Sequence, residues 1–322
     1  MHRAISVPVV LIALAGCSTQ VSSGEPSATE GQDLSSGKPY LALGDSVPFG
    51  YNPVDAVNDP TNIKAFTGYP EILPIAGKFA PNPIANASCE GETTGSFIDV
   101  TKPDNGCQQW KLAGDAMHVA YASPYESQLQ YAVSYLVQHP TTATVSIQIG
   151  ANDILLVQLG CEAAYDPTKD ANYIADVTAC EEAGIPAAIE GAVENIGYIA
   201  GALRQGAGYR GQIVVMTYYA LQYTNTADPT FQAVYGLDQA IVQLAQEVPT
   251  LGLYIGKSFS TFAAAATALG GGDSCKAGLL YKLSDGTCNK HPSLAGQALL
   301  AGVVATAVPA SQISLTASTP QF

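Results

Sequence analysis

YLALGDSVPFG, residues 40–50, begins as a short apolar run and turns at Gly44 into an Asp-Ser pair. The run at 40–43 predicts a buried first strand. A serine in the turn after a strand heads the next helix, whose terminal N–H groups point toward any oxyanion formed on a substrate. The stretch is not the Gly-x-Ser-x-Gly turn of α/β-hydrolases, because position 48 is proline. Alone, Gly-Asp-Ser is a common turn, so Ser46 gains meaning only from the rest of the chain.

Strand and helix signals alternate after this first strand. Strands are predicted at 83–87, 144–149, 212–218 and 251–255, the last of them being the final strand. Helices are predicted at 123–138, 185–205, 231–247 and 293–307, the first opened by Ser123 as N-cap with Pro124 and Glu126 behind it. Alternation of this kind implies an α/β fold, a parallel sheet with helices on both faces. Sites in such sheets form at the carboxyl ends of the strands.

Composition limits the classes of partner. The chain has 322 residues, of which 47% are hydrophobic and 12% charged, and its net charge is −14. An acidic chain repels phosphate backbones, so nucleic acid is not expected as a partner. It also gains no attraction from anionic lipid head groups.

The first residues predict an export signal. Arg3 precedes an apolar run at 5–15 that is too short to span a bilayer. Leu14-Ala15-Gly16-Cys17 then resembles a bacterial lipobox, which would make 1–16 the signal peptide and Cys17 the lipidated N-terminus. Cleavage after Ala15 by an ordinary signal peptidase is the alternative, giving a secreted protein. We favour the envelope lipoprotein, held to the membrane by its lipid anchor.

Residues 18–37 are polar and predict a flexible stem, so that 17–37 joins the anchor to one domain at 38–322. The chain has seven cysteines, and lipidation of Cys17 would leave an even number. Six cysteines allow 15 pairings. Sequential pairing closes short loops and is expected in an oxidising compartment. The expected pairs are Cys89 with Cys107, Cys161 with Cys180, and Cys275 with Cys288.

Three further motifs carry polar groups. Asn86-Ala87-Ser88-Cys89-Glu90-Gly91-Glu92-Thr93 follows the second predicted strand, and its Gly91 lets main chain approach a ligand. Gly150-Ala151-Asn152-Asp153 follows the third, where an amide can donate to an oxyanion. His291 precedes the last helix, and histidine is the natural base for a serine. Each has a plain alternative: a disulfide-closed loop, an Asx turn and an incidental histidine.

Taken together, Ser46, Gly91, Asn152 and His291 occur in the order of the four blocks that name the GDSL (SGNH) hydrolases, and the chain resembles that superfamily from about residue 38 onward. The resemblance implies a three-layer α/β/α, flavodoxin-like fold. It implies Ser46 as nucleophile and His291 as base. The N–H groups of Ser46 and Gly91 and the side chain of Asn152 would form the oxyanion hole.

One position departs from the pattern of the superfamily. Members often have aspartate three residues before the histidine, and that position is Cys288 here. We expect the main-chain carbonyl of Cys288 to orient His291, with Asp285 as the alternative. The two expectations differ in whether a carboxylate faces the imidazole.

The expected activity is hydrolysis of a carboxylic ester through an acyl-Ser46 intermediate, with no metal or cofactor. Lipase, short-chain esterase and carbohydrate O-deacetylase remain open, so the substrate is a small-molecule, lipid or acylated carbohydrate ester. The tyrosines at 218, 219, 223 and 235 line a cleft or pack internally, and the 161–180 insertion is placed to shape an acyl pocket. The alternative from another class is a non-catalytic surface lipoprotein that uses the fold as a binding module.

Overall fold

The computed structural model describes residues 39–73 and 84–307. The expected signal peptide, Cys17 and the stem to residue 37 lie outside the described residues. None of the helices within the described ranges combines the length and the hydropathy needed to cross a membrane.

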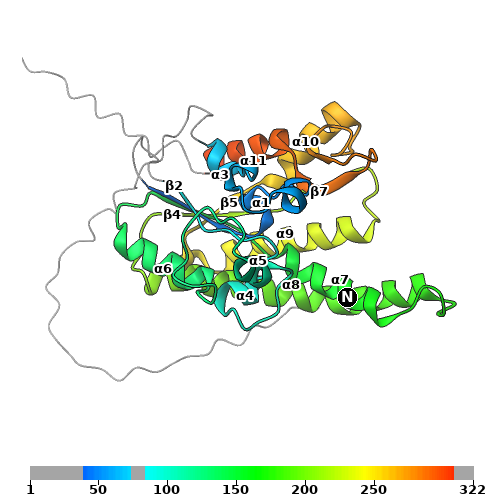
Figure 1. Ribbon diagram of the computed structural model, residues 1–322, viewed down its shortest axis with the longest axis horizontal. Coiled ribbons are helices and arrows are strands. Elements are labelled where there is room, and N and C mark those ends of the chain that lie inside the picture. The colour runs from blue at the N-terminus through cyan, green and yellow to red at the C-terminus, as the bar shows by residue number, and fades with distance from the viewer. Residues whose placement is uncertain (1–38, 74–83, 308–322) are drawn as a thin grey trace, which may run out of the picture. The chain divides into compact units, whose positions relative to one another are not determined.

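Five parallel strands form the central sheet, in the order β2-β1-β3-β4-β5 (Figure 1). They are β1 (Tyr40–Gly44), β2 (Ile84–Asn86), β3 (Thr144–Gln148), β4 (Gln212–Met216) and β5 (Leu253–Gly256). This is the flavodoxin-like order, in which the direction of winding reverses between β1 and β3. The expected fold class is confirmed, and the reversal places the site at the carboxyl ends of these two strands.

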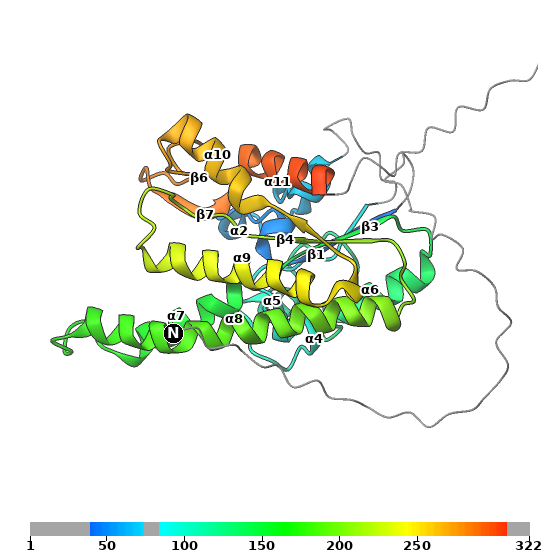
Figure 2. The same cartoon turned by 180° about the vertical axis from the view of Figure 1, so that it is seen from behind.

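Helices cover both faces of the sheet. Figure 2 shows one layer above the sheet and a second below it. The upper layer consists of α3 (Tyr69–Ile72), α10 (Ser258–Gly270) and α11 (Leu294–Ala307). The lower layer consists of α4 (Thr94–Ile98), α6 (Gln128–Gln138), α7 (Ala151–Ala164), α8 (Tyr173–Gln205) and α9 (Pro229–Glu247). The short elements α1 (Ser46–Phe49), α2 (Asp55–Asn58), η1 (Ile63–Ala65), α5 (Cys107–Ala113) and η2 (Pro249–Leu251) lie in the connections.

The core lies between the sheet and these two layers. All five residues of β1, β3 and β4 are buried, which is usual for parallel strands covered on both faces. On α8, Ile196, Ile199 and Leu203 recur at helical spacing and are fully buried against the sheet. The sheet is therefore a rigid support for the turns that follow its strands.

The start of α6 differs from the sequence-based expectation. Ser123 to Glu126 form a turn, with the Glu126 N–H donating to the Ser123 carbonyl at 3.1 Å. The helix begins five residues later than the Ser123 N-cap, at Gln128, because Ser127 and Gln130 form their own capping box. Gln128, the first residue of this helix, is fully buried.

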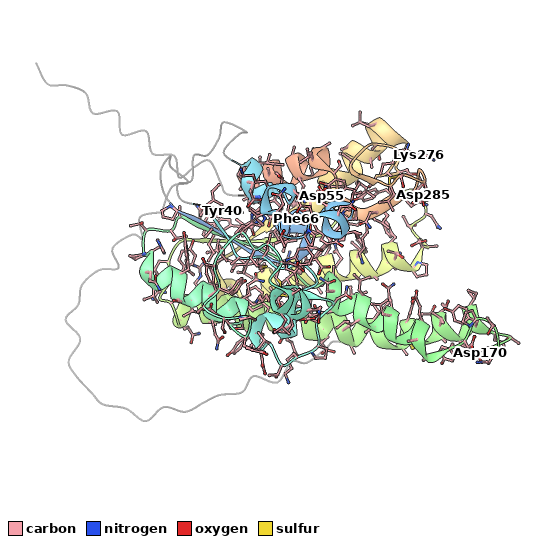
Figure 3. The ribbon with its side chains drawn as sticks, in the orientation of Figure 1. Tyr40, Asp55, Phe66, Asp170, Lys276 and Asp285 are labelled. Carbon is pink, nitrogen blue, oxygen red and sulfur yellow. A yellow bond between two sulfur atoms is a disulfide. The ribbon has the colours of Figure 1, made fainter. Side chains whose placement is uncertain are left out.

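The helix predicted at 185–205 begins at Tyr173. Pro186 lies inside α8 rather than in its first turn. The additional turns lie beside α7, which was not predicted, and the Cys161–Cys180 disulfide joins the two helices. Asp170 marks the far end of this helical hairpin (Figure 3).

Three elements after β5 were also not predicted. Ser258 to Gly270 form α10. The strand at 251–255 is the last of the parallel sheet but not of the chain, because β6 (Leu280–Lys282) and β7 (Cys288–Pro292) form an antiparallel pair. His291 therefore lies in β7, between the paired residues Cys288 and Pro292, where the register of the hairpin is irregular.

Candidate active site

Ser46 is positioned by the turn that ends β1. Gly44 has a φ of 138°, and a Cβ there would lie 2.0 Å from the Gln148 carbonyl oxygen of β3, so only glycine fits. The Gln128 side chain holds the same residue, accepting from the Gly44 N–H at 2.5 Å and donating to its carbonyl at 2.9 Å. Asp45 then caps α1 by accepting from the Val47 N–H at 2.9 Å. Ser46 is thus the first residue of α1 and is 7% exposed.

Three side chains from distant parts of the chain hold the carbonyls of α1. Gln297 donates to Val47 at 2.9 Å, Asn86 donates to Pro48 at 2.8 Å, and His118 Nε2 donates to Phe49 at 3.0 Å. The Gly50 N–H at the C-cap also donates to the Val47 carbonyl at 3.1 Å, and the last carbonyls of a helix depend on such partners from outside it. The orientation of α1, and so of Ser46, is set by the surrounding structure.

His291 lies opposite Ser46. Its Nε2 is 2.9 Å from the Ser46 Oγ, although the residues are 245 positions apart. The phenol of Tyr219 donates to the Lys290 carbonyl at 2.9 Å, which ties β7 to the end of β4. The ring of Tyr51 lies 4.6 Å from the imidazole, centroid to centroid. The imidazole is therefore enclosed, and its residue is 7% exposed.

The other ring nitrogen of His291 contacts Asn289. The Asn289 Oδ1 lies 2.5 Å from Nδ1 and also accepts the main-chain N–H of His291 at 3.1 Å. Since a main-chain N–H is always a donor, this atom is the amide oxygen, and Nδ1 carries the proton. Nε2 is then the free acceptor that faces Ser46.

The expectation that the Cys288 carbonyl orients His291 is wrong, and the alternative, Asp285, is not in place either. Asp285 lies on the exposed turn between β6 and β7 (Figure 3), where its carboxylate accepts from the N–H and hydroxyl of Thr287 at 2.9 and 2.6 Å. The Asn289 side chain, two residues before the histidine, lies against the ring instead.

Burial controls the charge state of the site. Desolvation, with Lys290 nearby, lowers the pKa of His291 to about 3, so the imidazole is neutral at pH 7. Burial also raises the pKa of Asp45 to about 7, although hydrogen bonds from the Tyr218 phenol and the Val47 N–H oppose the rise. Among the residues that the structure describes, no carboxylate is bonded to His291.

The proposed oxyanion donors lie at the ends of three neighbouring strands. Within the described ranges, the N–H groups of Ser46 and Gly91 have no hydrogen-bond acceptor. Gly91 has a φ of 71°, and a Cβ there would lie 2.3 Å from the Asn105 carbonyl oxygen. The Asn152 amide donates to the Glu92 carbonyl at 2.9 Å and accepts from Asn105 at 3.1 Å. One of its two amide hydrogens remains for a ligand.

A pocket of about 120 Å³ opens beside these groups and is lined by Ser46, Asn152 and His291 at one end. Apolar side chains from α7 and α9 form its walls. Two of the four singled-out tyrosines, Tyr218 and Tyr219, line it. The other two, Tyr223 and Tyr235, pack with Phe231 and Phe259 at ring distances of 5.2–6.3 Å. The tyrosines therefore divide between the pocket and the packing behind it.

The structure contains the three sequential disulfides, Cys89–Cys107, Cys161–Cys180 and Cys275–Cys288. Glu92 lies beside the first, and the three side chains are spaced like a metal site. Both sulfurs are already bonded to each other, so this group is not a metal centre. The third disulfide joins β7 to the segment before β6, directly ahead of Asn289 and His291.

Sequence reasoning missed four residues of this site: Asn289, Gln128, His118 and Gln297. Asn289 had a local signal, because asparagine commonly bonds the N–H two residues ahead of it. The other three contact the motif turn across at least 69 positions, and no spacing rule predicts such contacts.

No protein-family model matches the sequence, and no curated protein matches it. Solved structures with a similar fold include phospholipase A1 from Streptomyces albidoflavus NA297, with 20% identity over 84% of this chain and all of that one, and a TM-score of 0.47. An extracellular lipase from Streptomyces rimosus has 18% identity, the same coverage and a TM-score of 0.48. An acetylxylan esterase from Geobacillus stearothermophilus has 17% identity over 84% of this chain and 94% of its own, with a TM-score of 0.46. At these sequence identities and TM-scores, the activities of these proteins are not assigned to this chain.

Proposed function

We propose that the protein is a serine hydrolase of the GDSL (SGNH) type that cleaves carboxylic esters through an acyl-Ser46 intermediate. The observation that carries the proposal is the 2.9 Å contact between Ser46 Oγ and a neutral, Nδ1-protonated His291. A serine beside a correctly oriented base is the arrangement that nucleophilic catalysis requires.

The proposed reaction has two halves. His291 Nε2 takes the proton of the Ser46 hydroxyl while Oγ bonds to the ester carbonyl carbon. The tetrahedral oxyanion accepts from the N–H groups of Ser46 and Gly91 and from the Asn152 amide. When the bond to the leaving alkoxide breaks, the alcohol takes its proton from Nε2. A water molecule then attacks the acyl-serine, giving its proton to His291, and the carboxylic acid leaves as the Ser46 hydroxyl is restored.

Labelling with a fluorophosphonate probe tests the proposal, because such probes react with activated serines. We expect the protein to be labelled and to hydrolyse 4-nitrophenyl hexanoate, and Ser46→Ala to lose both properties with an unchanged circular dichroism spectrum. A non-catalytic binding module is the alternative, and an unlabelled, folded wild-type protein would establish it.

We also propose that the protein is exported as an envelope lipoprotein anchored through Cys17. Three disulfides support an oxidising compartment. Lipoprotein diacylglyceryl supplies the two chains that stable anchoring requires. Cys17→Ser should release the protein from the membrane fraction or block its processing. Sedimentation of the variant with salt-washed membranes would place the anchor elsewhere.

A further inference from the structure

The pocket beside Ser46 lies between two helices, each of which supplies one of its walls. Ile154 and Leu155 of α7 form one wall, and Ala233, Val234 and Leu237 of α9 form the other. Ile154, Ala233 and Leu237 are at most 5% exposed, so they are fixed parts of the core rather than loose surface groups. An apolar wall of this kind favours binding of a hydrocarbon group, whereas a sugar hydroxyl buried against it would have no hydrogen-bond partner there.

The pocket has a defined length. The α7 wall runs from Asn152, at the catalytic end, to Gln158, and six residues of helix span ~9 Å. On α9, Leu237 lies at the catalytic end of the pocket, because its methyl groups would be 3.4 Å from a Cβ on Gly150. The far end is polar: Gln158 is half-buried and Thr230 is exposed. A chain longer than the pocket would therefore pass into water.

The volume sets a similar limit. The pocket holds about 120 Å³, less than the ~150 Å³ engineered cavity that binds benzene, so there is room for about six carbons. An acetyl group would leave most of this apolar space unfilled, and a palmitoyl chain would extend well beyond it.

We infer that the pocket between α7 and α9 is the acyl site and that the preferred substrates are esters of medium-length acyl groups, of about six carbons. The inference rests on the proposed ester hydrolase activity and narrows it. It separates this protein from an acetyl-specific deacetylase and from a lipase for long chains. The alcohol group of the ester would leave on the side of the imidazole, away from α9.

A second pocket provides a matched control. It lies on the other side of α7 and is lined by Leu156 of α7, by Ala188 and Asn195 of α8, and by Lys102. Ala188→Leu adds the same three carbons there as Ala233→Leu adds to the acyl site. Both alanines lie on long helices, which accept leucine readily.

The experiment measures kcat/KM for 4-nitrophenyl acetate, hexanoate, decanoate and palmitate. We expect hexanoate to be the best substrate of the wild-type protein. In Ala233→Leu the hexanoate-to-acetate ratio should fall at least about tenfold, since one methylene in an apolar pocket changes discrimination by 10- to 200-fold. Leu155→Ala, at a half-buried position, should raise the decanoate-to-hexanoate ratio by a similar factor. Ala188→Leu should leave both ratios unchanged.

Preference of the wild-type protein for acetate or palmitate would overturn the inference. So would an equal change of the ratios in Ala188→Leu and Ala233→Leu. If Ala233→Leu does not fold, Leu155→Ala decides alone: an unchanged decanoate-to-hexanoate ratio contradicts the acyl site. Fluorophosphonate labelling distinguishes failure of the acyl-site inference from failure of the ester hydrolase proposal. A labelled protein with the wrong chain-length preference contradicts only the acyl-site inference. An unlabelled protein contradicts the ester hydrolase itself and the acyl site with it.

Discussion

Asn289 accepts both N–H groups of His291 with one oxygen atom, the main-chain N–H at 3.1 Å and ring Nδ1–H at 2.5 Å. The bond fixes the tautomer of the base, which in many serine hydrolases is the task of a carboxylate. An amide oxygen orients the ring but has no net charge, so it stabilises the imidazolium less than a carboxylate does. This difference has a measurable consequence for the pH dependence of activity.

Asn289→Asp should move the acid limb of the kcat/KM–pH profile to higher pH. A carboxylate beside the ring favours the imidazolium, so it raises the pKa of His291 from about 3. Below its pKa the base is protonated and inactive, and the variant should therefore lose activity at a higher pH than the wild-type protein. Asp45 and Glu90, whose burial raises their pKa values to about 7, titrate in both proteins. The difference between the two profiles thus isolates His291.

Two further variants complete this test. Asn289→Ala should lose roughly 100-fold or more in kcat, the usual contribution of a positioned base. Asp285→Asn should lose less than about tenfold, because Asp285 binds only its own turn. A ~10,000-fold loss in the folded Asp285→Asn variant would instead make that carboxylate the third catalytic member.

Asn152→Ala should lower kcat by about 100- to 1,000-fold, the cost of one oxyanion donor. The amide is held by Glu92 and Asn105 at 2.9 and 3.1 Å, so it is oriented before substrate binds. The measurement is steady-state kinetics on one ester, with Asn195→Ala as the control because that amide bonds Thr94 instead. A change in KM alone would make Asn152 a substrate-binding residue.

Gln297→Leu should lower kcat with little change in KM. The substitution releases the Val47 carbonyl and leaves the buried Tyr69 N–H without its 2.9 Å acceptor. An orphaned buried donor costs about 1–3 kcal/mol, which denaturant unfolding would detect. A shift of α1 by ~1 Å can cost 100-fold in rate. Loss of stability with kcat intact would show that Gln297 supports the fold but does not position Ser46.

Removal of the Cys275–Cys288 disulfide should impair catalysis as well as stability. The bridge closes a loop with a separation of 13 residues and is worth about 3 kcal/mol. It also ends one residue before Asn289. Removal of Cys161–Cys180, with a separation of 19, should cost similar stability but less kcat, since it joins α7 and α8 away from His291. Equal losses of kcat in the two double variants at a temperature where both are folded would contradict this prediction.

The parts of the site that follow the parallel strands could be predicted from sequence. Ser46, Gly91 and Asn152 come directly after strands, and the carboxyl ends of parallel strands meet at one edge. The parallel sheet follows from the alternation of strands and helices. The flavodoxin-like fold and the roles expected of these residues came from the resemblance to the GDSL (SGNH) hydrolases.

The parts that depend on side-chain contacts across the fold could not. The helix predicted from residue 185 begins earlier, at Tyr173, where its added turns pack on α7, and the predicted Ser123 cap is replaced by the capping box of Ser127 and Gln130. Asn289 was missed because the search for the orienting group considered only the Cys288 carbonyl and Asp285, and not the side chain two residues before His291. A strand after β5 had too little periodicity to be recognised in five residues.

Helix α7 carries the Asn152 amide at its first turn and one wall of the pocket further along. The same rod is fixed on its other side, where Asp153 accepts from the N–H and hydroxyl of Thr94 at 3.0 and 2.6 Å. If the proposed roles hold, a substitution that tilts α7 to admit a new acyl group also displaces the Asn152 amide, the proposed oxyanion donor. Helix α9 contributes no catalytic group. Laboratory selection for a different acyl chain length should accordingly yield substitutions mainly on α9, where the chain-length preference can change without lowering kcat.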